Sequence, residues 1–151
     1  MLVLTSISCR RIAAFLILIA AVGHATAVEI GRIKVATGNV SVERNGQPVA
    51  GRVGLRLEPA DVLKTGVDGS VGITMSDNSL LSAGPNSILS LARYDFDPTT
   101  SQGRFEAQLQ RGSLTVISGR IAKQDPQAMT VRTPSAILGV RGTEFAVAVD
   151  D

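Results

Sequence analysis

The stretch VLKTGVDGSVGITMSDNSLLSAGPNSILSL, Val62–Leu91, decides the fold. It is a series of short runs in which apolar and polar residues alternate, separated by pairs rich in Gly, Asn, Asp and Pro. A period of two over runs this short predicts half-buried β-strands, and the intervening residues predict turns. The apolar positions that should share one face are Val71, Ile73, Met75, Leu89 and Leu91.

The same alternation continues on both sides of this stretch, and no window beyond residue 27 shows a helical stripe. The further alternating positions are Ile33, Val35, Val40, Val42, Phe105, Ala107, Leu109, Phe145, Val147 and Val149. Asn45-Gly46 is a strong hairpin signal. The pattern predicts an all-β fold of short antiparallel strands in a β-helix-like (solenoid-like) or two-layer arrangement, with a plain β-sandwich as the alternative.

A nine-residue spacing also runs through this region. Its members are Val53, Val62, Val71, Leu80 and Leu89. Such a cadence fits strand-plus-turn units of a meander or the rungs of a coiling β-structure, and chance in a Val- and Leu-rich chain is the alternative. A polar stretch from Asp95 to Gly103 predicts an exposed loop.

The first 27 residues read as a secretory signal. Arg10 and Arg11 precede the uncharged run Ile12–Val22, and the small residues Ala25-Thr26-Ala27 follow it. This order of basic, apolar and small residues predicts cleavage after Ala27, with an uncleaved short anchor as the alternative. We therefore expect residues 28–151 to be one domain in the periplasm or outside the cell, with no integral membrane span after cleavage.

Composition removes several classes of function. Without residues 1–27 the 15 basic residues become 13, which balance 13 acidic ones, so a nucleic-acid partner is not expected. Cys9 and His24 are the only Cys and His, and both precede residue 28. The remaining chain cannot form disulfides, Cys–His or Ser-His-Asp catalytic groups, or the common zinc sites, and no cofactor is expected.

Carboxylates are the only groups left for chemistry. Asp95 and Asp97 alternate in YDFD and could share a face, as the two acids of a glycosidase must. The series Asp95, Asp97, Thr99, Ser101 and Glu106 also follows a calcium-loop count. Thr100 stands where that loop needs Gly, however, and Pro98 interrupts it, so we predict neither a metal site nor an enzyme.

The stretch TPSAILGVRGTEF, Thr133–Phe145, sets an arginine between two glycines near the end of the chain. Pro134 should hold Thr133 extended at a strand start or edge. Residues 135–140 should be buried, and the glycines should permit a sharp reversal or a bulge before a closing strand from Thr143 to Val149. We expect Arg141 to be held by backbone carbonyls or an acid, with presentation to a partner as the alternative. The motif residues proposed to bind a partner are Thr133, Pro134, Gly139, Arg141, Gly142, Thr143 and Phe145.

Four pieces of the chain, in order, resemble the FecR-like periplasmic domain of the FecR protein family. They are GNVSVERNGQPV (38–49), VLKTGVDGSVGITMSDNSLLSAGPNSILSL (62–91), LQRGSLTVISGRI (109–121) and VRTPSAILGVRGTEFAV (131–147). One departure is Ala60 before Asp61, where the family usually has Gly. That puts the local turn in question, because Ala resists positive φ.

Well-known members of that family are membrane-spanning regulators that control a sigma factor and receive a signal in the periplasm. The resemblance implies a stand-alone exported form without the anti-sigma segment, binding an unidentified envelope protein through protein–protein contacts. We expect strand addition at the first strand, near Ile33–Val35, or at the last, near Phe145–Val149. A structural or self-assembling envelope protein is the alternative.

Overall fold

A computed structural model describes residues 28–140 and 144–150, which are almost entirely β-structure. The strands are β1 (Gly31–Thr37), β2 (Val40–Arg44), β3 (Gln47–Ala50), β4 (Arg56–Leu57), β5 (Val62–Thr65), β6 (Ser70–Met75), β7 (Leu80–Ala83), β8 (Ile88–Phe96), β9 (Gly103–Ile117), β10 (Met129–Arg132), β11 (Ile137–Gly139) and β12 (Glu144–Val149). One short helix, α1 (Arg120–Gln124), follows β9; the sequence pattern does not predict it. The predicted all-β fold is confirmed.

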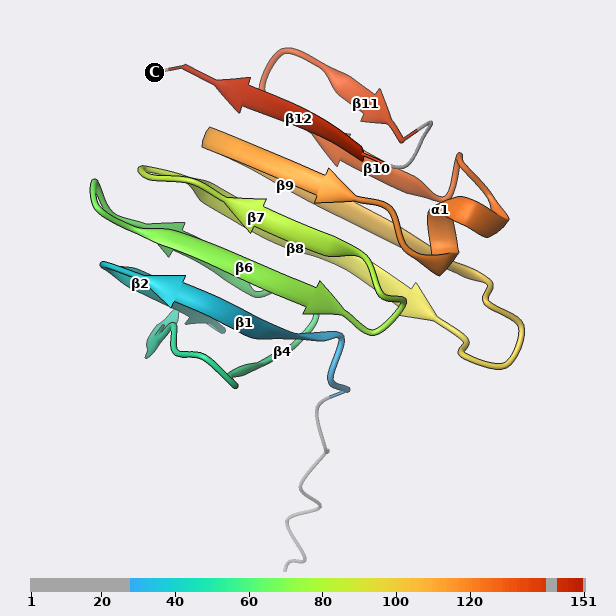
Figure 1. Cartoon of the computed structure of the whole chain (residues 1–151), viewed down its shortest axis with the longest axis horizontal. Helices are drawn as coiled ribbons and strands as arrows, with labels where there is room; N and C mark the ends of the chain where they lie inside the picture. Colours follow the sequence, from blue (N-terminus) through green and yellow to red (C-terminus); the bar gives the residue numbers. More distant parts are fainter. Residues whose placement is uncertain (1–27, 141–143, 151) are drawn as a thin grey trace, which may run out of the picture.

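The strands form one continuous sheet that curls into a half-barrel (Figure 1). We call its two halves sheet A and sheet B. Sheet A runs β4-β1-β6-β7-β9-β12, and sheet B runs β3-β2-β5-β8-β9-β10-β11. All pairings are antiparallel except that of β10 with β9. The arrangement is two-layered rather than helical, because the pairings between neighbouring strands are antiparallel with one exception.

Four long arms bend from one sheet into the other at a common corner. They are β1–β2, β5–β6, β7–β8 and the single strand β9. The 15-residue β9 bends at Gly112, whose φ is +88°, and a Cβ there would overlap Ser87. Only glycine tolerates both conditions, so Arg111-Gly112 forms a bend within a strand.

Hydroxyl groups join neighbouring arms along the corner. Ser87 N donates to Thr65 Oγ1 at 2.8 Å, and Thr65 Oγ1 donates to Gly84 O at 2.7 Å. One arm further on, Ser113 N donates to Ser87 Oγ at 3.0 Å. These bonds satisfy backbone groups that the sheet ladders cannot reach where the chain changes sheet. The corner is therefore formed by three segments, Leu63–Gly66, Gly84–Ser87 and Arg111–Ser113.

The core lies between the two sheets, and the alternating residues fill it as predicted, with one exception. Phe105 and Leu109 from sheet B and Ile73 and Leu114 from sheet A are all fully buried in a single cluster. Val35 was expected inside, but a bulge between Ile33 and Val35 shifts the register of β1 and turns Val35 to the solvent.

Other local predictions have mixed outcomes. Asn45 and Gly46 both have positive φ and close the β2–β3 hairpin, as predicted. The predicted 95–103 loop is shorter, since β8 continues to Phe96 and β9 begins at Gly103. The nine-residue spacing falls at or beside the starts of β5 to β8. Nine is an odd number, so Val71 and Leu89 face the core while Leu80 is exposed, and the spacing marks strand starts, not a stacked repeat.

Candidate functional site

The described part of the 133–145 motif forms a hairpin at the outer edge of sheet B. Thr133 N donates to Ala136 O at 2.8 Å, and Ala136 N donates to Thr133 Oγ1 at 3.0 Å. Pro134 occupies the exposed tip of this turn between β10 and β11. The sequence therefore placed Pro134 correctly at a sheet edge, but its neighbours have a different environment from the one expected.

Residues 135–140 were predicted to be buried, and that prediction is wrong for all but the last. Ile137 is 65% exposed, whereas Val140 is buried and donates its N–H to Met129 O. The physical reason is that β11 pairs only with β10, so no second layer covers it. Gly139 lies in β11 without a positive φ, and the rest of the 139–142 segment expected to reverse or bulge lies mostly outside the described residues.

Arg141, Gly142 and Thr143 lie outside the described residues. Both interpretations of Arg141 therefore stay predictions. The strand that follows is present as β12, which pairs along all six of its residues with the second half of β9. Phe145, Val147 and Val149 point toward the core but are only half-buried.

The edges of the sheet differ in how well they are protected. Pro48 interrupts the ladder on β3, while β4 and β11 are only 2 and 3 residues long. β12 has 6 residues with no proline, and its only charge is Glu144 at its start. Charges, prolines and short length are the usual means of blocking an edge. Among the described residues, β12 is the edge best suited to accept another strand.

The first strand was the other predicted edge, and the structure only partly supports it. Residues 54–57 cover its first half: Ile33 N donates to Leu55 O, and Gly54 N donates to Ile33 O. The edge is left uncovered by β4 only beyond Ile33. Here Val35 is 55% exposed.

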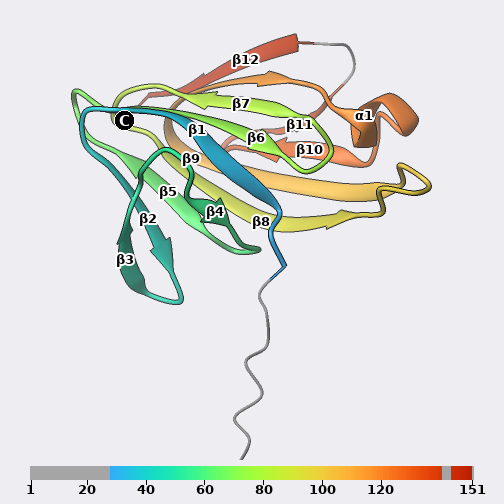
Figure 2. The same ribbon diagram turned by 60° about the horizontal axis from the view of Figure 1, so that its bottom comes forward.

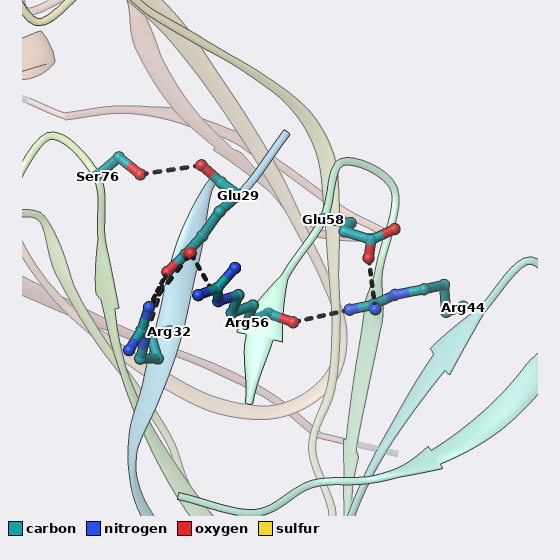
Figure 3. A network of polar contacts seen from close by, with 6 residues as sticks. All are labelled: Glu29, Arg32, Arg44, Arg56, Glu58 and Ser76. Atoms are coloured by element: carbon teal, nitrogen blue, oxygen red, sulfur yellow. Dashed lines mark hydrogen bonds and ion pairs between the residues drawn. The ribbon is translucent and has the colours of Figure 1, made fainter. Parts of the chain in front are cut away.

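A network of charges closes the side of the molecule next to β1 and β2 (Figure 3). Arg44 forms a bidentate pair with the buried carboxylate of Asp61, at 2.9 and 2.7 Å, and reaches Glu58 at 2.6 Å. The Nη2 group of Arg44, which bonds Asp61, also donates to Arg56 O. The hydrogen bond to Asp61 raises the pKa of Arg44 above its ordinary value. The network continues through Arg56 and Glu29 to Arg32.

Ala60 adopts a positive φ, the conformation that alanine resists and that glycine would accept. Its φ is +68°, in the left-handed region that glycine prefers. The turn nevertheless keeps its bonds, because Ala60 N donates to Leu91 O at 2.9 Å and Asp61 N donates to Glu58 O. The turn therefore forms with Ala in place, under strain.

A second buried carboxylate, Asp77, organises the opposite end of the arms. It accepts hydrogen bonds from Tyr94 Oη, Ser79 N, Ser79 Oγ and Ile121 N. Burial raises the pKa of Tyr94 above its ordinary value, and the negative charge of Asp77 raises it further. These contacts tie the β6–β7 turn to α1 and β8. Every oxygen of Asp77 is occupied, so the group is structural rather than catalytic.

The carboxylates considered for chemistry are not arranged for it. Asp95 pairs with Arg93 at 2.8 Å, and Asp97 accepts Thr99 N, which holds the pKa of Asp97 below its ordinary value. A general acid needs the opposite shift. Glu106 of the calcium count pairs with Arg104 instead. In residues 28–140 and 144–150 no three metal-ligating side chains cluster.

The solvent side of sheet A carries a feature that the sequence analysis missed. A groove of about 270 Å³ runs over Gly72, between Val35 on one side and Leu80 and Ile117 on the other. These three apolar side chains are 55%, 42% and 41% exposed. The sequence carries part of the signal, since β6, β7 and the second half of β9 contain no charged residue, but the groove itself depends on how these strands pair.

Comparison with known protein families matches residues 61–151, more than half of the chain, to the family described as FecR protein. The chain belongs to the FecR family. This family consists of signal-transduction regulators and is not known as an enzyme family. The match covers the last three of the four motif pieces, and the first, at 38–49, precedes it. No curated protein and no solved structure matches. No helix in the described FecR chain is long and apolar enough to cross a bilayer.

Proposed function

We propose that this FecR-family chain is an exported periplasmic module that senses a signal by binding an envelope protein, without catalysing a reaction. One observation carries the proposal: β12 presents an open edge of six residues at the end of sheet A, and its only charge is Glu144 at its start. An incoming extended segment would continue the ladder beyond β12. Its inward side chains would cover Phe145, Val147 and Val149.

The chemistry of the edge defines the segment that it would accept. The inward face needs apolar residues at every second position, because it must complete the cover over a half-buried row. The outward face needs small or polar residues, since the exposed Ala146 and Ala148 offer little side-chain surface for a larger residue to pack against. Such a partner gains backbone hydrogen bonds for affinity and the apolar row for specificity.

Photocross-linking in living cells tests the edge directly. A photoreactive residue is placed at Ala146 or Ala148 in β12, and at exposed Ala92 of sheet B as the matched control. We expect both β12 positions to capture one common protein, with mass spectrometry locating the cross-link in an extended segment. Capture of the same proteins from Ala92, or of none from β12, would contradict the proposal.

An edge-blocking variant adds an independent readout. Val149→Lys puts a charge on the inward side of the edge, where it opposes an added strand. We expect the cross-link to disappear while circular dichroism stays β-rich. Amino-terminal sequencing of the accumulating chain tests export separately: a sequence beginning at Val28 supports it, and a retained Met1 in the cytoplasmic fraction opposes it.

A further inference from the structure

The two solvent-facing sides of the half-barrel have different chemistry. The outer side of sheet B carries the ion pairs Glu43–Lys64, Arg93–Asp95 and Arg104–Glu106. The central strands of sheet A, β6, β7 and the second half of β9, instead present only Ser, Thr, Gly, Leu and Ile to the solvent, while Lys34 and Val35 of the neighbouring β1 line one side of the groove. The core does not require this difference. Exposed apolar residues gathered around a groove are typical of a contact surface.

One cross-strand row spans the outer side of sheet A, and its charges are segregated. The strand register aligns Arg56, Arg32, Thr74, Leu80, Ile117 and Glu144, in that order from β4 to β12. The row is basic at one end, acidic at the other and uncharged between them. Glu29 neutralises only part of the basic end, since it faces both arginines.

This row is complementary to itself. A two-fold axis parallel to the strands, between β6 and β7, reverses the row onto a second copy. Arg56 then lies opposite Glu144 of the copy at both ends of the row, and Leu80 lies opposite Thr74 at its centre. The charges at the two ends are therefore complementary under this operation.

We propose that the outer side of sheet A is a self-association surface, on which a second copy of this chain packs face to face. Sheets stacked in this way lie about 10 Å apart with strands crossing at about 30°. The edge of β12 stays free for another protein. This inference concerns a different surface from the proposed function, so either can fail alone.

The size of the surface sets the expected strength. Six strands about 4.8 Å apart and about six residues long cover roughly 500 Å². Stable interfaces bury about 800 Å² on each partner. We therefore expect a weak dimer, with a Kd on the order of 10–100 μM.

Sedimentation equilibrium of the full gene product, in the form that accumulates in the host, tests the proposal. Over concentrations from about 10 μM to 1 mM, we expect a shift from monomer to dimer mass. Leu80→Glu should weaken the association at least about tenfold, because it buries a charge opposite the uncharged Thr74 at the centre. Ile137→Glu, at a more exposed position on β11 outside this surface, should leave the association unchanged.

A charge exchange tests the orientation. Glu144→Arg alone and Arg56→Glu alone should each weaken the dimer about three- to tenfold, and the double variant should restore it. A monomer at about 1 mM would overturn the proposal, as would a dimer that withstands Leu80→Glu. Photocross-links from Leu80 to a different protein, with none to a second copy, would assign the surface to that partner and overturn it as well.

Discussion

The two flanks of the half-barrel each add edge strands to both sheets, but the chemistry of those strands differs. On the N-terminal flank, residues 45–61 supply β3 to sheet B and β4 to sheet A. On the C-terminal flank, residues 118–150 supply β10 and β11 to sheet B and β12 to sheet A. Figure 2 shows the two sets at opposite ends of the curled sheet.

The N-terminal flank is closed tightly. Leu57 is fully buried, and the Arg44 network holds the turn around Asp61 against β2 and β4. On the described part of the C-terminal flank, Phe145, Val147 and Val149 on β12 are half-buried, and Ile137 is exposed. The difference indicates that one flank is closed by buried side chains while the other leaves apolar side chains partly exposed.

Removing the central cation of the closed flank should have the largest effect. Arg44→Ala leaves Asp61, which is 1% exposed, as an unpaired buried carboxylate. Breaking a buried pair in this way costs about 3–5 kcal/mol of the free energy of unfolding. Urea denaturation measures it. Arg32→Ala, which breaks a partly exposed pair, should cost less than about 1 kcal/mol. Equal losses would show that the closed flank does not depend on the buried pair.

Truncating the aromatic residue of the C-terminal flank should cost less. Phe145→Ala is expected to lower the free energy of unfolding by about 1–2 kcal/mol, because the ring is only half-buried. Phe105→Ala, in the fully buried half of β9, should cost about 3–5 kcal/mol. Thermal unfolding of the two variants compares them. A Phe145 loss as large as that of Phe105 would mean that the flank is already closed.

Ala60 offers a way to tighten the closed flank further. Ala60→Gly removes the cost of the left-handed conformation, about 1–2 kcal/mol. It also lowers the free energy of unfolding by about 0.5–1 kcal/mol, because glycine increases the conformational entropy of the unfolded chain. We expect a net stabilisation of about 0.5–1 kcal/mol, read as a higher urea midpoint with an unchanged slope. Asn86→Gly, at another left-handed position, is the matched control because Asn tolerates that region. No gain in stability from Ala60→Gly would mean that the strain does not lie at Ala60.

Local rules in the sequence were enough to predict the strands and the first hairpin. A period of two depends only on neighbouring side chains, and Asn45-Gly46 depends only on backbone sterics. The same rules failed at Val35, because a bulge arises from pairing with β6 and leaves no local signal. They failed again at residues 135–140, where burial depends on a layer that the fold does not supply.

The buried carboxylates could not be recognised by residue type. Asp61 and Asp77 resemble turn residues, which they are, but their burial follows from contacts with Arg44 and Tyr94, distant in the sequence. The site residues divide in a similar way. The edge at β12 was predictable from its alternation, whereas the groove over Gly72 required the register of four strands.

The smallest expected effect concerns the charges at the C-terminal flank. The hydrogen bond from Arg104 lowers the pKa of Glu106, and Arg132 on β10 contributes at the longer distance of 4.0 Å. A carboxyl with a lowered folded pKa stabilises the protein above its unfolded pKa, and this contribution is lost as the pH falls through the folded pKa.

Carboxyl-carbon NMR titration follows Glu106 alone. Arg104→Gln should raise the pKa of Glu106 toward its ordinary value, and Arg132→Gln should raise it less, because the first pair is shorter, at 2.7 Å. A larger effect from Arg132 would mean that β10 is held to β9 by this charge. The C-terminal flank would then be locked ionically like the N-terminal one, and the contrast between the flanks would fail.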